Sequence, residues 1–98
     1  MTNQKVIVLA ELTVQPQFID EAIALSRENI NFSLQEPGCE TFIMTSKKDD
    51  PYILVFFEIW NSQEALQWHM ERSYTKEFFQ NIPSRLVKDP VLQFLELR

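Results

Sequence analysis

The stretch Tyr52-Ile53-Leu54-Val55-Phe56-Phe57-Glu58-Ile59-Trp60 decides the fold, because it has the pattern of a strand with two apolar faces. Successive side chains of a strand point to opposite faces. One face is wholly aliphatic or aromatic and consists of Ile53, Val55, Phe57 and Ile59. The other face carries Tyr52, Leu54, Phe56, Glu58 and Trp60. We expect the first face to meet the helices of the domain.

The segments before this strand follow the period of a strand and then that of a helix. Alternating apolar residues predict a strand from Lys5 to Val14, which Pro16 ends. Apolar residues at helical spacing predict a helix from Gln17 to Leu34. This helix should stop before Pro37-Gly38, because proline disfavours helical geometry in the preceding residue and Gly38 is free to turn.

The remaining segments complete a β-α-β-β-α-β order. A strand from Cys39 to Lys47 leads through a turn at residues 48–51 into the strand 52–60. Asn61 or Ser62 can cap the next helix, Ser73 restarts a short helical segment, and a last strand runs from Val91 to Leu97. We therefore predict a ferredoxin-like α+β fold with a four-stranded antiparallel sheet and helices on one face.

The second apolar face of the strand 52–60 predicts a homodimer. Two helical segments cover only one face of such a sheet, so the face with Tyr52, Leu54, Phe56 and Trp60 lacks an internal partner. Burying one large apolar side chain contributes ~1.5–3 kcal/mol, and a contiguous exposed apolar patch marks an interface or a ligand groove. We expect a second copy to pack sheet to sheet.

Composition excludes several classes of site. The 98 residues suit one domain, 1–98, with 45% apolar and 23% charged residues. Gly38 is the only glycine, which excludes glycine-rich phosphate loops. Cys39 and His69 are the only residues of their types, which excludes an intrachain disulfide and a Cys/His zinc cluster. We expect no flavin, haem or metal cofactor.

Charge and hydropathy exclude two kinds of partner. The net charge is −5 and the nine lysines and arginines are scattered, so we expect no nucleic-acid binding. No apolar run approaches the ~20 residues of a membrane span. The start, Met1-Thr2-Asn3-Gln4-Lys5, lacks the features of a signal peptide, so we expect a cytoplasmic protein.

Three groups of residues resemble the antibiotic biosynthesis monooxygenase domain: Glu36-Pro37-Gly38-Cys39, the stretch 57–66 from Phe57-Glu58-Ile59-Trp60 to Ala65-Leu66, and His69. The resemblance covers almost the whole chain and is strongest from Glu36 to Phe79. It implies a dimeric α+β barrel of ferredoxin-like subunits. Such domains include cofactor-independent monooxygenases of phenols and quinols, haem-degrading enzymes, an isomerase of a phosphorylated signalling sugar, and members without demonstrated activity.

The resemblance implies two catalytic residues. His69 stands where the quinol-oxidising and isomerase branches carry a histidine, and it would act as a general base. The alternative is a histidine that is hydrogen-bonded at a helix end and chemically idle. Tyr74 stands where some relatives place a second histidine, and its phenol would donate a hydrogen bond to a substrate oxygen.

Further residues are expected to bind the substrate: Glu58, Trp60, Phe56 and Phe78. Glu58 would orient His69 or have a raised pKa itself, or would instead be paired at the dimer seam. A planar aromatic substrate would stack on Trp60, unless this residue only packs in the core. Trp68 is expected on the outer helix face or at an interface, and Cys39 is expected to be a small buried hydrophobe. No other histidine exists to bind iron, which excludes haem.

The predicted function is oxidation of a small phenolic or quinol-like compound by O₂ without a cofactor. One alternative is an isomerase that moves a proton beside a carbonyl of a phosphorylated metabolite, with Arg72, Lys76 and Arg85 as candidate phosphate ligands. Another is a non-catalytic dimer that binds a small ligand. A basic pocket rim would favour the isomerase, an apolar rim the oxygenase, and a filled cavity a structural role.

Overall fold

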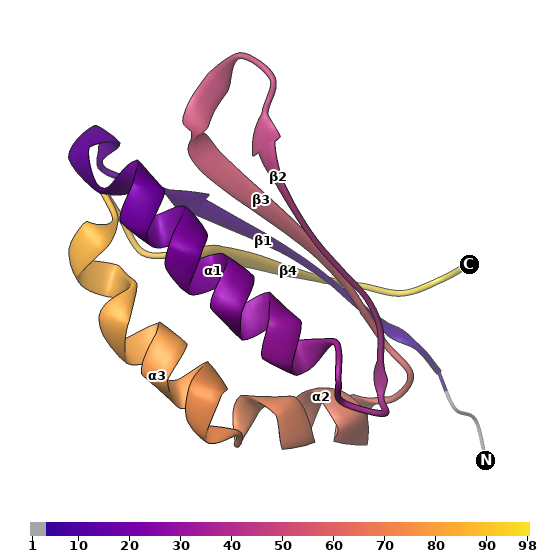
Figure 1. The fold of residues 1–98 in the computed structure, drawn as a ribbon. Coiled ribbons are helices and arrows are strands. Elements are labelled where there is room, and N and C mark those ends of the chain that lie inside the picture. The colour runs from indigo at the N-terminus through magenta and orange to yellow at the C-terminus, as the bar shows by residue number, and fades with distance from the viewer. Residues whose placement is uncertain (1–3) are drawn as a thin grey trace.

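Four antiparallel strands form a sheet in the order β2-β3-β1-β4, in a computed structural model that describes residues 4–98 (Figure 1). The strands are β1 (Val6–Thr13), β2 (Cys39–Lys47), β3 (Asp50–Trp60) and β4 (Val91–Leu95). The helices are α1 (Ile19–Ser33), α2 (Gln63–Met70) and α3 (Ser73–Asn81), with short 3₁₀ turns at Pro16–Phe18 and Pro83–Arg85. All three helices lie on one face of the sheet, as the predicted ferredoxin-like α+β fold requires (Figure 1). Residues 1–3, on which part of the signal-peptide interpretation depends, lie outside the described residues.

The element boundaries have local causes. The hydroxyl of Ser62 accepts a hydrogen bond from the Ala65 amide at 3.1 Å, so Ser62 is the cap of α2. Pro16 opens a 3₁₀ turn, and α1 therefore begins at Ile19 rather than at Gln17. The Asp50 carboxylate accepts a hydrogen bond from the Tyr52 amide at 3.0 Å, and β3 begins two residues earlier than predicted.

The predicted assignment of the two faces of β3 is wrong. Leu54, Phe56 and Trp60 face the helices and are 2%, 5% and 0% exposed. The face expected to meet the helices, Ile53, Val55, Phe57 and Ile59, is only half-buried and lies on the open side of the sheet. The register on β1 explains the difference, because the apolar Ala10 pairs with Phe56 whereas Glu11 pairs with Val55.

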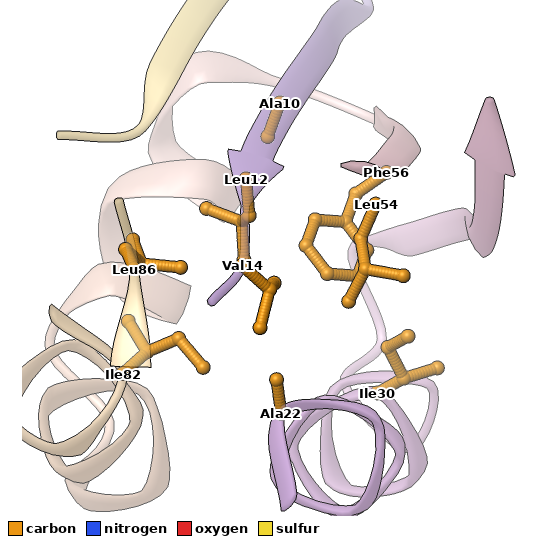
Figure 2. Close-up of a cluster of buried hydrophobic side chains, with 9 residues drawn as sticks. All are labelled: Ala10, Leu12, Val14, Ala22, Ile30, Leu54, Phe56, Ile82 and Leu86. Atoms are coloured by element: carbon orange, nitrogen blue, oxygen red, sulfur yellow. The ribbon is translucent and has the colours of Figure 1, made fainter. Parts of the chain in front are cut away.

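The core lies between the helix-facing side of the sheet and α1 (Figure 2). It contains the side chains of Ala10, Leu12, Val14, Ala22, Ile30, Leu54, Phe56, Ile82 and Leu86. Ile82 and Leu86 come from the segment that follows α3 and close the end of the core beside Val14 (Figure 2). The segment after α3 therefore belongs to the same core as the first strand.

The open face of the sheet remains apolar in the single chain. Phe57 of β3 lies between Leu9 of β1 and Ile43 of β2, and Ile43 is 50% exposed. The face without an internal partner is therefore the opposite one from that predicted, with Phe57 rather than Phe56 near its centre.

Gly38 allows close approach of α2 rather than a special turn. No described glycine has a positive φ, so the conformational freedom expected from the sequence is not used. A Cβ atom on Gly38 would instead overlap with the Cβ atom of Ala65 in α2. Only glycine fits at this contact.

We expect Gly38→Ala to lower the free energy of unfolding by ~1–3 kcal/mol, because the added methyl group overpacks the contact with Ala65. Urea denaturation measures the loss. Ala65→Gly, which alone costs ~1 kcal/mol of helix propensity, should recover stability when combined with Gly38→Ala. This explanation would be contradicted if the double variant lost as much unfolding free energy as the two single variants together.

Candidate functional site

A cavity of about 290 Å³ lies between the helix-facing side of the sheet and the helices. Most of its wall is apolar and includes Phe56, Leu66, Phe78, Leu92 and Phe94. Its polar wall residues are Ser26, Asn29, Glu58, Gln63, Gln67 and His69. Among the described residues, no lysine or arginine lines this cavity. Such a site suits a small, mostly apolar and uncharged ligand.

His69 is fixed in the cavity wall by a buried carboxylate. It lies in α2 and is 4% exposed, and its Nδ1 atom is 2.8 Å from Oε2 of Glu36. Glu36, which is 5% exposed, lies in the turn between α1 and β2. The Tyr74 hydroxyl donates to the same Oε2 atom. One carboxylate oxygen therefore holds both the imidazole and the phenol.

This contact determines the tautomer of His69. A carboxylate only accepts hydrogen bonds, so Nδ1 carries the proton and Nε2 is the basic nitrogen of the neutral ring. Within residues 4–98, Nε2 has no hydrogen-bond partner, while Thr75 Oγ1 lies 3.4 Å from Nδ1. The basic nitrogen is thus left available to a ligand.

Burial and charge act on His69 in opposite directions. Burial lowers the pKa of His69, and the hydrogen bond and negative charge of Glu36 oppose this by raising it. The net pKa lies below the ordinary value, so the ring is neutral at neutral pH and can accept a proton. Burial and Glu36 raise the pKa of Tyr74, which therefore remains a hydrogen-bond donor.

Trp60 connects His69 to the second ionisable group of the cavity. Its ring centroid is 4.3 Å from that of His69, and its indole N–H donates to Glu58 Oε1 at 2.9 Å. Burial raises the pKa of Glu58 to about 7; the Trp60 hydrogen bond opposes this and the charge of Glu36 adds to it. Glu58 therefore titrates near neutral pH.

The structure brings most of the predicted site residues together. Glu58, His69, Phe56 and Phe78 line the cavity. Trp60 is fully buried behind the wall, where it contacts His69 and Glu58.

Three expectations for single residues had different outcomes. The Tyr74 hydroxyl, expected to hold a substrate oxygen, donates to Glu36 instead, and Tyr74 is not part of the cavity wall. Trp68 is 45% exposed with the Arg72 guanidinium 3.7 Å from its ring, as expected for the outer helix face. Cys39 was expected to be buried but is only half-buried, and burial raises its pKa to about 11.

Glu36 is the site residue that sequence reasoning missed. The sequence shows it only as the first residue of Glu36-Pro37-Gly38-Cys39, at a position read as a helix end. The sequence signal is an acidic residue at a predicted turn, and its importance becomes visible only because the fold buries it.

Within residues 4–98, no group of three or more His, Cys, Asp or Glu side chains is arranged to hold a metal ion. No helix of this part of the chain is long and apolar enough to cross a membrane.

Comparisons with known proteins agree with this architecture. The family model described as antibiotic biosynthesis monooxygenase matches residues 5–81. An uncharacterised protein of Synechocystis is 29% identical over 95 residues; the match covers 97% of this chain but only 65% of that protein.

Two solved structures are similar over nearly the full length. A conserved protein of Methanosarcina mazei has a TM-score of 0.94 at 24% identity, covering 98% of this chain and 95% of the other. A structure described as an antibiotic biosynthesis monooxygenase has a TM-score of 0.90 at 25% identity, covering 95% and 98%.

Proposed function

Because this chain belongs to the antibiotic biosynthesis monooxygenase family, we propose that it oxidises a small phenolic or quinol-like compound with O₂ and without a cofactor. The observation that carries the proposal is the pairing of His69 with buried Glu36 at the wall of an apolar cavity. The pairing prepares Nε2 to accept a proton, which is the first requirement of this chemistry.

The proposed reaction starts with proton transfer from a substrate hydroxyl to Nε2 of His69. The carboxylate of Glu36 stabilises the imidazolium that results, because the two groups are 2.8 Å apart and shielded from water. The substrate anion then transfers one electron to O₂, and the two radicals combine to a peroxide anion. The imidazolium of His69 returns its proton to this anion, and loss of water from the hydroperoxide, with the hydrogen of the same carbon atom, gives the quinone. Tyr74 acts as a positioning residue, because it holds Glu36.

The cavity wall argues against the phosphorylated substrate of the isomerase alternative. None of its described wall residues is a lysine or an arginine. Arg72 lies over the Trp68 ring and donates to the Trp68 carbonyl, and Arg85 contacts Glu21 and the Asn81 carbonyl. The binding-only alternative shares the open cavity with the oxygenase, so turnover separates the two.

Oxygen uptake by chelator-treated protein tests the proposal. The substrates are a panel of hydroquinones, catechols and anthrones, and we expect uptake with at least one of them. The rate should be the same before and after treatment with EDTA. If members of the panel bind but none consumes oxygen, the chain is a binding protein and the oxygenase proposal is wrong.

We further propose that the open face of the sheet forms a homodimer. Phe57, between Leu9 and Ile43, is near the centre of this face. Light scattering at micromolar concentration should give about twice the mass of one chain. Phe57→Lys should give the mass of a single chain, because a charge replaces a buried contact.

Leu34→Lys is the matched control, because Leu34 is an apolar residue that is 50% exposed but follows α1. Its mass should equal that of the wild type. A wild-type protein that stays a folded monomer would disprove the dimer, and a doubled mass for Phe57→Lys would place the contact elsewhere.

A further inference from the structure

Glu58 is an acidic side chain in the cavity wall that has no cationic partner among residues 4–98. It is 8% exposed, and its cross-strand neighbours are the apolar Val8 of β1 and Phe42 of β2. The cavity wall it belongs to has no lysine or arginine among the described residues. A buried carboxylate in such surroundings is costly unless a ligand or a proton compensates it.

The two carboxylate oxygens of Glu58 differ in their contacts. Oε1 accepts the hydrogen bond of the Trp60 indole at 2.9 Å. Oε2 has no hydrogen-bond partner within residues 4–98. Among these residues, the only side-chain oxygen or nitrogen that is both fully buried and without a partner is Oε1 of Glu36, so Oε2 of Glu58 is not fully buried. Oε2 is therefore accessible from the cavity that Glu58 lines.

Three ionisable groups surround Glu58. His69 of α2 faces the same cavity, and the charges of Glu36 and Glu58 both act on Cys39 at the start of β2. Burial and the charge of Glu36 raise the pKa of Glu58 to about 7, against the effect of the Trp60 hydrogen bond. An ionised carboxylate accepts a hydrogen bond from a hydroxyl, and the protonated form donates one to a carbonyl. Near neutral pH both forms of Glu58 are present, so Glu58 can bind either a hydroxyl or a carbonyl oxygen of a ligand.

We propose that Glu58 determines which ligands the cavity binds. Its Oε2 atom binds one oxygen of a neutral ligand whose other oxygen contacts His69. Its negative charge excludes ligands that carry a carboxylate or a phosphate. The first part follows because Glu58 and His69 are the two ionisable side chains in the described wall of one mostly apolar cavity, and Trp60 contacts both. The second follows because the described wall residues include no lysine or arginine that would offset a second negative charge.

The size of the cavity limits the ligand further. An engineered cavity of about 150 Å³ accommodates benzene. The volume of about 290 Å³ is nearly twice as large and suits two fused rings. The inference rests on the site of the proposed function, but it concerns binding and does not require turnover.

Calorimetric titration of the full chain with three naphthalenes of similar shape tests the inference. The probes are 2,6-dihydroxynaphthalene, 2-naphthol and 6-hydroxy-2-naphthoate. At pH 8, the dihydroxy compound should bind about tenfold more tightly than 2-naphthol, because it makes one more hydrogen bond. The naphthoate should bind at least about tenfold more weakly than 2-naphthol, because its charge lies beside ionised Glu58.

Glu58→Gln separates charge from shape, because glutamine keeps the size and the acceptor for Trp60. It should improve binding of the naphthoate about tenfold or more, while the preference for two oxygens remains. In the wild type, the NMR signal of the Trp60 indole N–H should shift with a midpoint near pH 7, and in Glu58→Gln it should not. Trp68→Phe identifies this signal. Glu64→Gln, on the exposed side of α2, is the matched control and should leave all three affinities unchanged.

Two results would overturn the inference: wild-type protein that binds the naphthoate as tightly as 2-naphthol, or a Glu58→Gln variant with the selectivity of the wild type. Failure of all three probes to bind would overturn it as well. The expected selectivity without any oxygen consumption would support the inference and refute the oxygenase proposal. The two proposals therefore fail in different measurements.

Discussion

His69→Gln is expected to lower turnover by ~10²–10⁴-fold, the range for loss of a general base. Glutamine keeps a hydrogen-bond donor for Glu36 but cannot accept the substrate proton at neutral pH. Oxygen uptake with a substrate identified from the panel measures the loss. The proposed dimer should not be affected, because His69 lies between the sheet and the helices rather than on the open face.

Protein stability provides an independent readout for the same variant. The pKa of folded His69 lies below its ordinary value of about 6.5, so the unfolded chain binds the proton more readily. The wild type should therefore lose stability as the pH falls below about 6.5, and His69→Gln should lose less. Full turnover in His69→Gln would exclude the general-base role and make Glu58 the next candidate.

Glu36→Gln should lower turnover by ~10–10²-fold, the usual effect of removing a group that orients a functional histidine. The amide oxygen still accepts the hydrogen bonds of His69 and Tyr74, but the negative charge that stabilises the imidazolium is lost. Because Glu36 raises the pKa of His69, its loss should lower that pKa further. The acid limb of kcat/KM should therefore move to lower pH, while the plateau falls.

This pH shift distinguishes a positioning role from simple damage to the fold. Damage would lower the rate at every pH without moving the acid limb. Tyr74→Phe is the matched control, because it removes one hydrogen bond from Glu36 and leaves the charge in place. Its acid limb should remain close to that of the wild type. An unchanged acid limb in Glu36→Gln would contradict the proposed coupling of Glu36 and His69.

The order of elements could be predicted from the sequence, whereas the faces of β3 could not. Periodicity and turn residues are local signals, and they predicted β2 with its observed bounds and a cap of α2 at Asn61 or Ser62, of which Ser62 is the one observed. Both faces of β3 are apolar, so alternation alone cannot show which one is covered. The answer depends on pairing with β1, where Glu11 and Thr13 mark the open side, and a register is not visible in one sequence.

The site was predictable in part for a similar reason. Glu58 was identifiable as an acid in an otherwise apolar strand, and the family resemblance that drew attention to His69 is confirmed. Glu36 is 33 residues away from His69, and only the packing of α2 against the α1–β2 turn brings them together. The packing of α3 against α1, with the Tyr74 ring stacked on Phe32, brings the Tyr74 hydroxyl to Glu36. The type of a reactive side chain can thus be read from the sequence, whereas its hydrogen-bond partners depend on tertiary contacts.

If the proposed reaction with O₂ takes place, the raised pKa of Cys39 affects how the protein withstands oxidation. Peroxide attacks the thiolate form of cysteine, and a thiol with a pKa of about 11 is almost entirely protonated at neutral pH. The more vulnerable sulfur belongs to Met70, which lines the cavity and is 43% exposed. Methionine sulfoxide is reversible by dedicated reductases, whereas overoxidised cysteine is mostly not. Leaked oxidant would thus cause a repairable lesion at the cavity wall and spare the thiol.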